Sequence, residues 1–555
     1  MSEGHHLSTK KADSIRSLFL YILLSLFIGF ISGEIMGWVL VADSNKTLLA
    51  EQQWMVENVY IAVPGINYDS EIKSWKTHFA GGLFFGLSIG LCYAFIWSLF
   101  FWIILNFKQD LWRFLYKLLH EINPVIFLIT WICFYSFIFY LIPAFFKLFY
   151  NLFTTGHWAF GLFLLIVPLV LYKLLLITKL YKNERINLTK TIPYIAGFLG
   201  AIIMVSMLIA TSLTGRDFIR IRDGLFGRIE WGRRISNFYY HYTLYPARVI
   251  KTFDQRLQRF LRIDSNDFSE EELKQLKRIF TWRDIFIGED APSDTVIKKD
   301  KETGNMIIIS KKHGFSIETS LENFFKDPKK IIVQYDIRTD SAAPLRRVVS
   351  LSLFNIWPLM GIFLIYLFLI IICGLLFKKS SSTRDTLFAF FSILLLIMGF
   401  RSLMVPKNIS LDTENLLNTI EGNGSGNKIT SIMALWERIE KDKNKVGHFS
   451  EHFIKMLDDP DPIIRKWGID FITLSGEKKA INIIIRLLND PDPNVAYHAA
   501  RSLGKFEVRE AREPLLKILE GKREWYLKTT AYIALRETGW SQLSLKRNLT
   551  EKRYQ

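Results

Sequence analysis

The chain has few cysteines and lacks the familiar catalytic signatures. Its 555 residues include three cysteines, Cys92, Cys133 and Cys373, all inside apolar runs. This placement excludes a disulfide framework and a cysteine-based zinc site. No Gly-x-Ser-x-Gly, His-Glu-x-x-His, Walker lysine loop or CxxC occurs. We therefore do not expect an enzyme, and we assign no catalytic, cofactor-binding or metal-binding residue and no cofactor.

Histidine is also absent from the centres of the apolar runs. His78, His120 and His157 all lie at their boundaries, which excludes a haem held between two histidines of neighbouring helices. What the chain does have is hydrophobic bulk together with charge: half of its residues are hydrophobic, yet 22% are charged. This combination is typical of a membrane protein with sizeable soluble parts.

The formal net charge of +17 raises the question of nucleic acid as a partner. Much of the excess lies in loops and juxtamembrane segments, where Lys and Arg orient membrane spans and meet anionic headgroups. We therefore favour membrane lipids, and not nucleic acid, as partners of the basic residues.

Seven apolar segments are long enough to cross a bilayer. They cover residues 15–41, 79–106, 122–147, 157–177, 191–213, 350–377 and 386–405. The first is too long for a signal peptide and is interpreted as an uncleaved anchor. Seven spans would put the N-terminus on one face of the membrane and both large soluble segments, about 214–348 and 406–555, on the other.

The distribution of Lys and Arg predicts the orientation. Short loops on the N-terminal side are richer in Lys and Arg, so we expect a cytoplasmic N-terminus in the plasma (inner) membrane and extracytoplasmic soluble domains. The arginines that follow the fifth span, from Arg216 to Arg234, favour the reverse orientation, although long loops weigh less in this rule.

Glycine recurs every four residues in the first two spans. The six positions are Gly29, Gly33, Gly37, Gly82, Gly86 and Gly90. Such a glycine zipper allows two helices to approach closely, and it predicts either a tight hairpin or a homo-oligomer seam. Alternatively, the spacing reflects only the high glycine content of membrane helices.

Glu34 is the acidic residue inside the first span, between Gly33 and Gly37. A charge there is costly unless it is paired, protonated or facing water, so Glu34 is a candidate intramembrane polar site for proton or ion coupling. The competing interpretation is that Glu34 reaches the membrane surface or hydrogen-bonds a neighbouring helix.

Residues 228–262 interleave basic and aromatic side chains. The residues chosen as a lipid or partner interface are Trp231, Arg233, Arg234, Tyr239, Tyr240 and Tyr242. Basic heads with aromatic bodies suit a helix in the headgroup layer. They also suit single-stranded nucleic acid, but the adjacent membrane span favours lipid or a partner membrane protein.

The soluble segment 214–348 is predicted to be a small α+β domain. Ser269-Glu270-Glu271-Glu272 has the spacing of a capping box and predicts a helix start. The predicted strands are 295–298, 306–310, 315–318 and 331–337, the first two joined across a turn containing Gly304. Asp284, Glu289, Asp290 and Asp294 lack calcium-loop spacing and are interpreted as a solvated surface.

The C-terminal segment repeats itself. Asp459-Pro460-Asp461-Pro462 returns 31 residues later as Asp490-Pro491-Asp492-Pro493. Apolar or small residues four apart follow each turn and continue in a third unit, which predicts stacked helix pairs. The proposed packing residues are Ile464, Gly468, Val495, Ala499, Leu503, Leu527, Ala531 and Leu535.

The segment from Asp490 to Gly504 resembles the HEAT-like repeats of the family that includes phycobilisome lyase subunits. The resemblance covers about residues 430–540 and implies an α-solenoid that binds proteins, without implying an activity. The first unit departs from the pattern at Trp467-Gly468, and the third lacks the Asp-Pro turn. The iron-binding His-Glu pairs of hydroxylase members are absent.

These features predict a mainly α-helical protein with a polytopic bundle of about seven spans, a small α+β insertion and a C-terminal α-solenoid. The predicted domains are 1–213 (five spans), 214–348 (α+β), 349–405 (two spans), 406–429 (linker) and 430–555 (repeats). We expect a membrane scaffold or accessory subunit that positions protein partners. The alternative is a transporter or channel component that uses Glu34.

Overall fold

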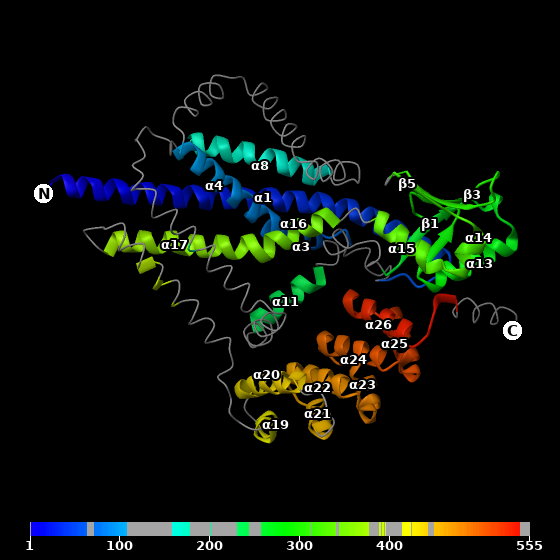
Figure 1. Ribbon diagram of the computed structural model, residues 1–555. Coiled ribbons are helices and arrows are strands. Elements are labelled where there is room, and N and C mark those ends of the chain that lie inside the picture. Colours follow the sequence, from blue (N-terminus) through cyan, green and yellow to red (C-terminus); the bar gives the residue numbers. More distant parts are fainter. Residues whose placement is uncertain are drawn as a thin grey trace.

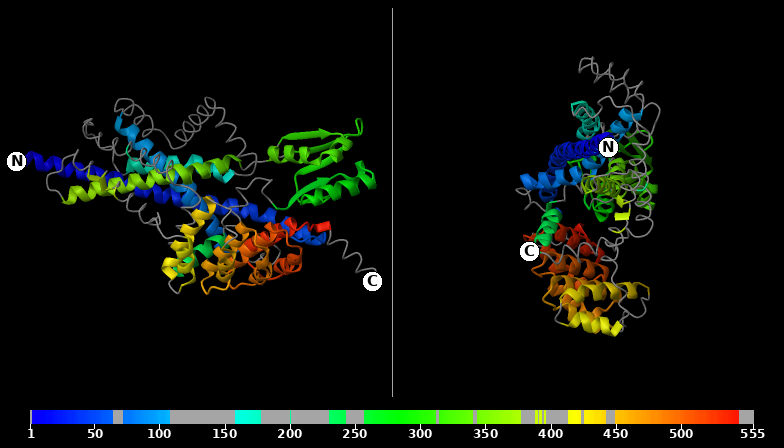
Figure 2. Two further views of the ribbon diagram at one scale, coloured as in Figure 1. Left: turned by 60° about the horizontal axis from the view of Figure 1, so that its bottom comes forward. Right: turned by 90° about the vertical axis from the view of Figure 1, so that its left-hand side faces the viewer.

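The computed structural model describes most of the chain. The continuous stretches are 2–63, 72–107, 158–177, 230–242, 257–311, 314–339, 343–376, 413–422, 425–441 and 449–543. Helices dominate them, with one small mixed sheet and a C-terminal stack of helix pairs, which confirms these parts of the predicted fold class (Figure 1). The long helices run side by side, and the sheet lies toward the end opposite the N-terminus (Figures 1 and 2).

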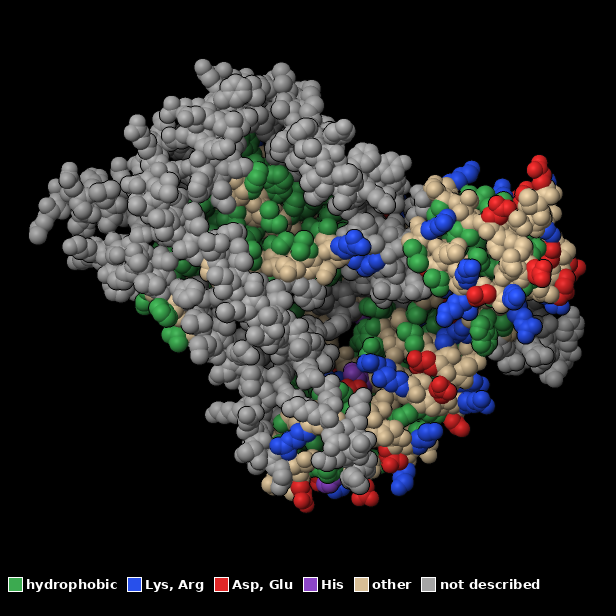
Figure 3. Space-filling view, in the orientation of Figure 1, with side chains coloured by type: hydrophobic (Ala, Val, Ile, Leu, Met, Phe, Trp, Pro, Cys, Tyr) green, Lys and Arg blue, Asp and Glu red, His purple; other side chains and the backbone are tan. Residues whose placement is uncertain are grey.

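The bundle is built from apolar helices. Its elements are α1 (Ser2–Glu57), α3 (Trp75–Phe85), η2 (Gly86–Gly90), α4 (Leu91–Phe107), α8 (Trp158–Ile177), α16 (Ala343–Leu351), η5 (Ser352–Ile356) and α17 (Trp357–Leu376). Phe95 of α4, Phe160 of α8 and Phe363 of α17 are buried in its core. Figure 3 shows a hydrophobic surface over this part, whereas charged side chains gather over the sheet and the repeats.

Two helices in the described residues are long and apolar enough to cross a membrane: Leu18–Glu57 and Trp75–Trp102. Two shorter apolar helices, Ala159–Leu174 and Trp357–Ile372, pack beside them. The spans predicted at 122–147, 191–213 and 386–405 lie outside the continuously described residues. The seven-span bundle therefore stays a prediction, since these helices by themselves establish only an apolar helical bundle.

Two π-helical segments face each other in the bundle, η2 in the second apolar helix and η5 at the start of α17. A π-turn displaces carbonyls from the ordinary helical pattern. Here two of these carbonyls accept hydrogen bonds from the opposite helix: the Trp357 indole donates to the Leu87 carbonyl (3.0 Å) and the Cys92 thiol donates to the Ser352 carbonyl (3.4 Å). One hydrogen bond in each direction therefore connects the two π-helical segments.

The five-stranded sheet has the order β2-β1-β3-β4-β5. Its strands are β1 (Arg259–Ile263), β2 (Ile285–Gly288), β3 (Thr295–Lys299), β4 (Met306–Ser310) and β5 (Phe315–Thr319). β1 pairs in parallel with β2 and β3, and β3, β4 and β5 pair antiparallel, with Ile297 opposite Ile308 and Ile308 opposite Ile317. Leu261, Ile297, Ile308 and Ile317 share the face that packs on helices.

Three helices cover that face: α13 (Glu270–Trp282), α14 (Leu321–Lys326) and α15 (Pro328–Thr339), and η4 (Ser265–Asp267) precedes them. The predicted capping box begins α13, because the Ser269 hydroxyl accepts from the Glu272 amide and the Glu272 carboxylate from the Ser269 amide. The strand predicted at 331–337 is wrong, since these residues belong to α15. Pro328 starts a helix there, and Ile331, Ile332 and Tyr335 recur at helical spacing on its buried side.

The C-terminal stack contains α19 (Thr413–Glu421), α20 (Ser425–Lys441), α21 (Ser450–Met456), α22 (Pro462–Ser475), α23 (Ile481–Leu487), α24 (Pro493–Lys505), α25 (Arg512–Glu520) and α26 (Trp525–Glu537). Short turns η7 (Lys478–Ala480) and η8 (Arg509–Ala511) lead into α23 and α25. The linker predicted at 406–429 is partly wrong, because it contains α19 and the start of α20. Leu416, Leu417 and Ile420 of α19 are buried against the first repeat.

Candidate functional site

The two Asp-Pro-Asp-Pro turns share one hydrogen-bonding pattern. The carboxylates of Asp459 and Asp490 each accept from the backbone amide two residues further on (2.9 and 2.8 Å). Asp461 and Asp492 then cap the following helices, again through the amide two residues on (2.9 and 2.8 Å). A proline occupies the next position, where no amide donor is needed. The motif therefore folds a sharp turn and starts a helix at once.

The first aspartate of each turn also receives a cation from the preceding repeat. The Lys428 ammonium lies 2.9 Å from Asp459, and the Arg465 guanidinium binds both oxygens of Asp490 at 2.9 Å. A paired guanidinium and carboxylate with this fork geometry is among the stronger polar contacts in proteins. At both turns, therefore, an ion pair connects the first aspartate to a helix of the preceding repeat.

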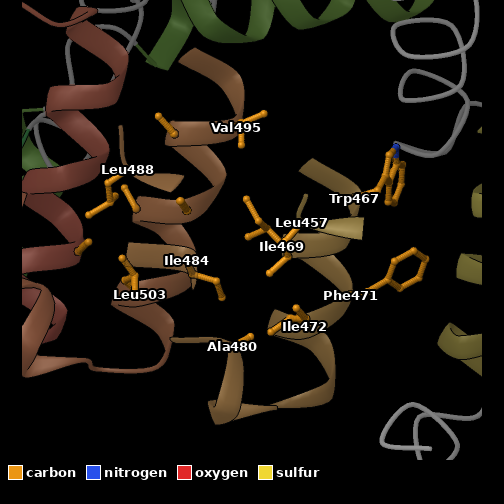
Figure 4. Packing of buried hydrophobic residues seen from close by; sticks show 14 of the residues in the cluster. Leu457, Trp467, Ile469, Phe471, Ile472, Ala480, Ile484, Leu488, Val495 and Leu503 are labelled. Carbon is orange, nitrogen blue, oxygen red and sulfur yellow. The ribbon is translucent and has the colours of Figure 1, made fainter. Parts of the chain in front are cut away.

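The core of the stack is apolar and tightly packed. All eight predicted packing residues are buried. Figure 4 shows Ile469, Ile472, Ile484 and Leu503 filling the space between successive helices. A Cβ atom added to Gly468 would lie 2.9 Å from the Cβ of Met456, so glycine is needed there for α22 to approach α21.

The third unit starts its second helix differently. Glu524 occupies the N-cap of α26 without a side-chain hydrogen bond to the helix. The next residue, Trp525, instead donates from its indole N–H to the carbonyl of His241 in α11 (Glu230–Tyr242), at 2.6 Å. The loss of the Asp-Pro turn thus coincides with a contact outside the stack.

A junction joins the last repeat, the sheet and the segment after α1. The Gln542 side chain accepts from the amide of Ile61 (3.1 Å) and donates to its carbonyl (2.9 Å). The Gln258 side chain, next to β1, also donates to this carbonyl (2.7 Å) and accepts from the amide of Val63 (2.9 Å). Two glutamines from distant parts of the chain therefore hold one short backbone segment.

The carboxylate of Asp284 is at the polar centre of the junction. It accepts from the hydroxyl of Tyr532 (2.6 Å) and from Nε of Arg536 (3.0 Å), both on α26. The Arg536 guanidinium also donates to the Trp282 carbonyl and lies over the Trp282 ring. Asp284 has a φ of 55°, a conformation that aspartate tolerates better than most residues.

Burial shifts the proton equilibria at this centre. It raises the pKa of the Asp284 carboxyl above its ordinary value, and Arg536 and Tyr532 oppose the shift. It also raises the pKa of the Tyr532 hydroxyl, because the phenolate would be desolvated and would face the Asp284 carboxylate. The prediction that Asp284 belongs to a solvated surface is therefore wrong. Its sequence surroundings are charged, and only tertiary contact with α26 reveals its role.

The end of α1 completes the junction. The indole of Trp54 donates to the Asp290 carboxylate (3.0 Å) and meets the Phe260 ring edge-on, with the ring centroids 5.8 Å apart. A Cβ atom at Gly288 would lie 2.7 Å from the Trp54 ring, so β2 comes very close to α1. The residues of this junction were missed by sequence reasoning, because each one alone is typical of an ordinary core or surface position.

The six glycines of the first two apolar helices face one another. A Cβ atom at Gly33 would lie 2.9 Å from Cα of Gly86, and one at Gly37 would lie 2.6 Å from Cα of Gly82. Gly29 and Gly90 approach equally closely through their backbones. Within one chain, α1 and the α3–η2 helix therefore bring their backbones into contact along this face.

Glu34 lies beside this glycine contact. Its Oε1 atom accepts from the Trp38 indole (2.9 Å), and its carboxylate fills the space that a side chain at Gly82 would take. Its Oε2 atom is buried and has no hydrogen-bond partner among the described residues. The ring of Trp38 also lies next to that of His78, with the centroids 5.9 Å apart.

The predicted lipid or partner interface coincides with α11. Trp231, Arg233 and Arg234 are exposed on it, and Arg234 pairs with Glu230. Tyr242 is half-buried and contacts Phe238. The side chains of Tyr239 and Tyr240 are outside the described part of the structure. Within the described residues no group of three or more His, Cys, Asp or Glu side chains is placed to hold a metal ion.

Comparison with known proteins identifies the C-terminal stack. Residues 450–536 match the family of HEAT repeats, so this part of the chain is a HEAT-repeat module. The match agrees with the helix pairs and their turns described above, and it confirms the resemblance seen in the sequence. Neither a curated protein nor a solved structure matches the chain.

Proposed function

We propose that this protein is an integral membrane scaffold or accessory subunit that binds and positions a protein partner through its HEAT repeats. HEAT repeats generally mediate protein–protein interaction through extended surfaces. The observation that carries the proposal is the junction, in which Tyr532 of α26 is bonded to the sheet domain and Gln542, just after α26, is bonded to the segment after α1. A module fixed in this way can present its remaining repeats at a defined position relative to the bundle.

The proposed setting is the plasma (inner) membrane, with seven spans and a cytoplasmic N-terminus. The two long apolar helices support this setting, and so do large apolar side chains on the outside of the bundle: Phe27, Ile35 and Phe368 are 65, 61 and 51% exposed. Because the glycine faces are occupied within one chain, they support a hairpin. A homo-oligomer would need another surface.

The second candidate function is a transporter or channel component. It is favoured by one observation, the buried Glu34 Oε2 atom without a partner. Against it, the contacts of Glu34 with Trp38 and Gly82 are those of a helix-packing residue. A flux that disappears in Glu34→Gln while partner binding persists would favour this alternative.

Site-specific photocrosslinking in native membranes tests the scaffold proposal. A crosslinker at exposed Arg501 of α24 should capture one or a few proteins reproducibly, identified by mass spectrometry. The same group at Lys517, exposed on α25 of the next helix pair, serves as the matched control for a different face of the module. Absence of protein adducts from both positions, and from every other exposed position of the repeats, would contradict the scaffold proposal.

A further inference from the structure

Helix α11 has an exposed apolar face. Trp231 and Ile235, one helical turn apart, are both 56% exposed. Phe238 and Tyr242 follow at positions that continue the same face. Gly232, by contrast, is buried. The helix thus contacts the protein through one narrow side, and its hydrophobic side is turned outward.

One basic side chain flanks this face. Arg234, next to Ile235, is exposed, as is its ion pair with Glu230, whereas the exposed Arg233 lies one helical turn before Asn237 on the polar side. Arginines beside an exposed tryptophan suit the headgroup layer of a bilayer, since the ring enters the apolar boundary and the guanidinium reaches phosphate. The same charge would be unfavourable against a basic protein surface.

The helix that α11 contacts also has exposed aromatic side chains. α11 packs on α3, where Trp75 is 63% and Phe79 is 37% exposed, and their rings lie 6.0 Å apart. Tryptophans at the end of an apolar helix are typical of a membrane interface. The C-terminal end of α11 contacts the repeats, because the Trp525 indole donates a hydrogen bond to the His241 carbonyl.

We propose that the face of α11 formed by Trp231 and Ile235, with Arg234 at its edge, binds anionic phospholipid headgroups, and that α11 thereby holds the last HEAT repeat against the bilayer. This inference rests on the proposed membrane setting. Apolar burial supplies adhesion, and Arg234 makes it depend on lipid charge. The lipid surface, and not a protein, is the partner of this helix.

The test uses the full chain in nanodiscs of phosphatidylcholine, with and without phosphatidylglycerol. A nitroxide on a non-natural residue replacing Ile235 reports collisions with a water-soluble nickel complex. The matched label replaces Asn237, an exposed position on the opposite, polar side of α11. Phosphatidylglycerol should lower the nickel collision rate at 235 and leave it unchanged at 237.

Charge reversal tests the arginine at the edge of this face. In Arg234→Glu the affinity for phosphatidylglycerol should fall at least roughly fivefold, whereas Arg233→Glu, on the polar side of α11, should lower it less. Equal nickel collision rates at 235 and 237 in both lipids would overturn the proposal, as would protection at 235 that appears only when another protein copurifies. Alkaline extraction of native membranes separates the two claims: a chain that is extracted refutes the membrane setting itself, whereas a retained chain with an unprotected label refutes only the role of α11.

Discussion

At the scale of single residues, Asp284 and Tyr532 carry the contact between the sheet domain and the last repeat. Burying either group without a hydrogen-bond partner would be unfavourable, because the Asp284 carboxylate has little contact with solvent and the Tyr532 hydroxyl is fully buried. Together with Arg536 and Gln542 they satisfy one another. Such mutual dependence makes the junction sensitive to small changes, because an unpartnered buried polar group costs more than its hydrogen bond contributes.

We predict that Tyr532→Phe destabilises the junction by about 1–3 kcal/mol, since the Asp284 carboxylate loses a donor while its burial is unchanged. Thermal unfolding of the purified protein would measure the loss. Tyr497→Phe is the matched control, because its ring is half-buried on the surface of the stack, and its effect should stay within about 0.5 kcal/mol. Equal effects of the two substitutions would contradict the assigned role of Tyr532.

The raised pKa of Asp284 predicts a pH dependence. The folded chain holds this proton more tightly than the unfolded chain does. The stability that Asp284 contributes is therefore full below the ordinary aspartate pKa, and it is lost as the pH rises through the folded-state pKa. Relative to the wild type, Asp284→Asn should gain stability as the pH is raised from about 4 to about 8.

Asp300 provides a control of opposite sign. A hydrogen bond from the Thr303 hydroxyl lowers the pKa of the Asp300 carboxyl, so its contribution is present above the ordinary aspartate pKa and is lost at lower pH. Asp300→Asn should therefore lose stability relative to the wild type as the pH is raised from about 2 to about 5. Parallel pH curves for the wild type and both variants would show that neither carboxyl is linked to folding.

The glycine contact predicts a steric effect that can be matched within the chain. Gly33→Leu or Gly86→Leu should force α1 away from the α3–η2 helix and cost about 1–3 kcal/mol, because an added Cβ would come closer than van der Waals contact. It would lie 2.9 Å from Cα of Gly86 in the first variant and 3.0 Å from the carbonyl oxygen of Phe30 in the second. Gly361→Leu on α17 should be tolerated, since a Cβ atom there has open space. Detergent-solubilised yield and melting temperature would distinguish the three variants.

At the scale of elements, local rules predicted the parts of the chain where local chemistry decides. The capping box at Ser269, the hairpin around Gly304 and the Asp-Pro turns all form as their sequences predict. The segment 331–337 was misread, because its β-branched residues favour a strand while a helix start at Pro328 and a buried helical face decide otherwise. Strands β1 and β2 were missed, since their pairing partners lie far apart in sequence.

The HEAT stack predicts a strong effect of charge in its core. Leu503 is fully buried between helices of adjacent repeats, so Leu503→Asp should destabilise the module by at least about 3 kcal/mol and unfold it. Arg501→Ala, two residues away on the exposed side of α24, should change the stability by less than about 0.5 kcal/mol. Limited proteolysis should release fragments of the repeats only from the Leu503 variant.

The ion pair at the second turn predicts a smaller loss. Asp490→Ala removes the partner of Arg465 and the bond that shapes the turn, and should cost about 2–4 kcal/mol. Asp458→Ala, at an exposed position just before the first turn, is the control and should be nearly neutral. A loss at Asp490 no larger than at Asp458 would mean that the repeats are spaced by apolar packing alone.

At the scale of the whole molecule, the sheet domain and the repeats are in direct contact through Asp284, Tyr532 and Arg536. We therefore predict that labels at Asn305 and Ser425 react from the same face of the membrane, and that a label at Ser2 reacts from the other. Impermeant reagents applied to intact cells and to inverted vesicles would measure this. Opposite labelling at Asn305 and Ser425 would mean that a span has been miscounted.

Most of the HEAT module could be predicted from sequence, whereas the junction could not. The module could be predicted because its sequence repeats: Asp459 and Asp490 occur in the same local sequence and form the same turn. Asp284, Tyr532 and Gln542 occur once each, and their meaning depends on neighbours hundreds of positions away. Glu34 is intermediate between the repeats and the junction in how far sequence predicts it. The sequence shows that its burial is costly, but only the structure shows that its carboxylate occupies the space left by the missing side chain of Gly82.

The junction also bears on how the protein is made. Gln542 grips the backbone of Ile61, a residue that leaves the ribosome 481 positions earlier. Until the last repeat has been synthesised, the segment after α1 lacks this partner and the side of the sheet domain around Asp284 has no cover. A chain that ends before the last repeat therefore exposes an apolar and acidic surface that is buried in the complete chain. Quality-control proteases and chaperones can distinguish the two forms by this surface.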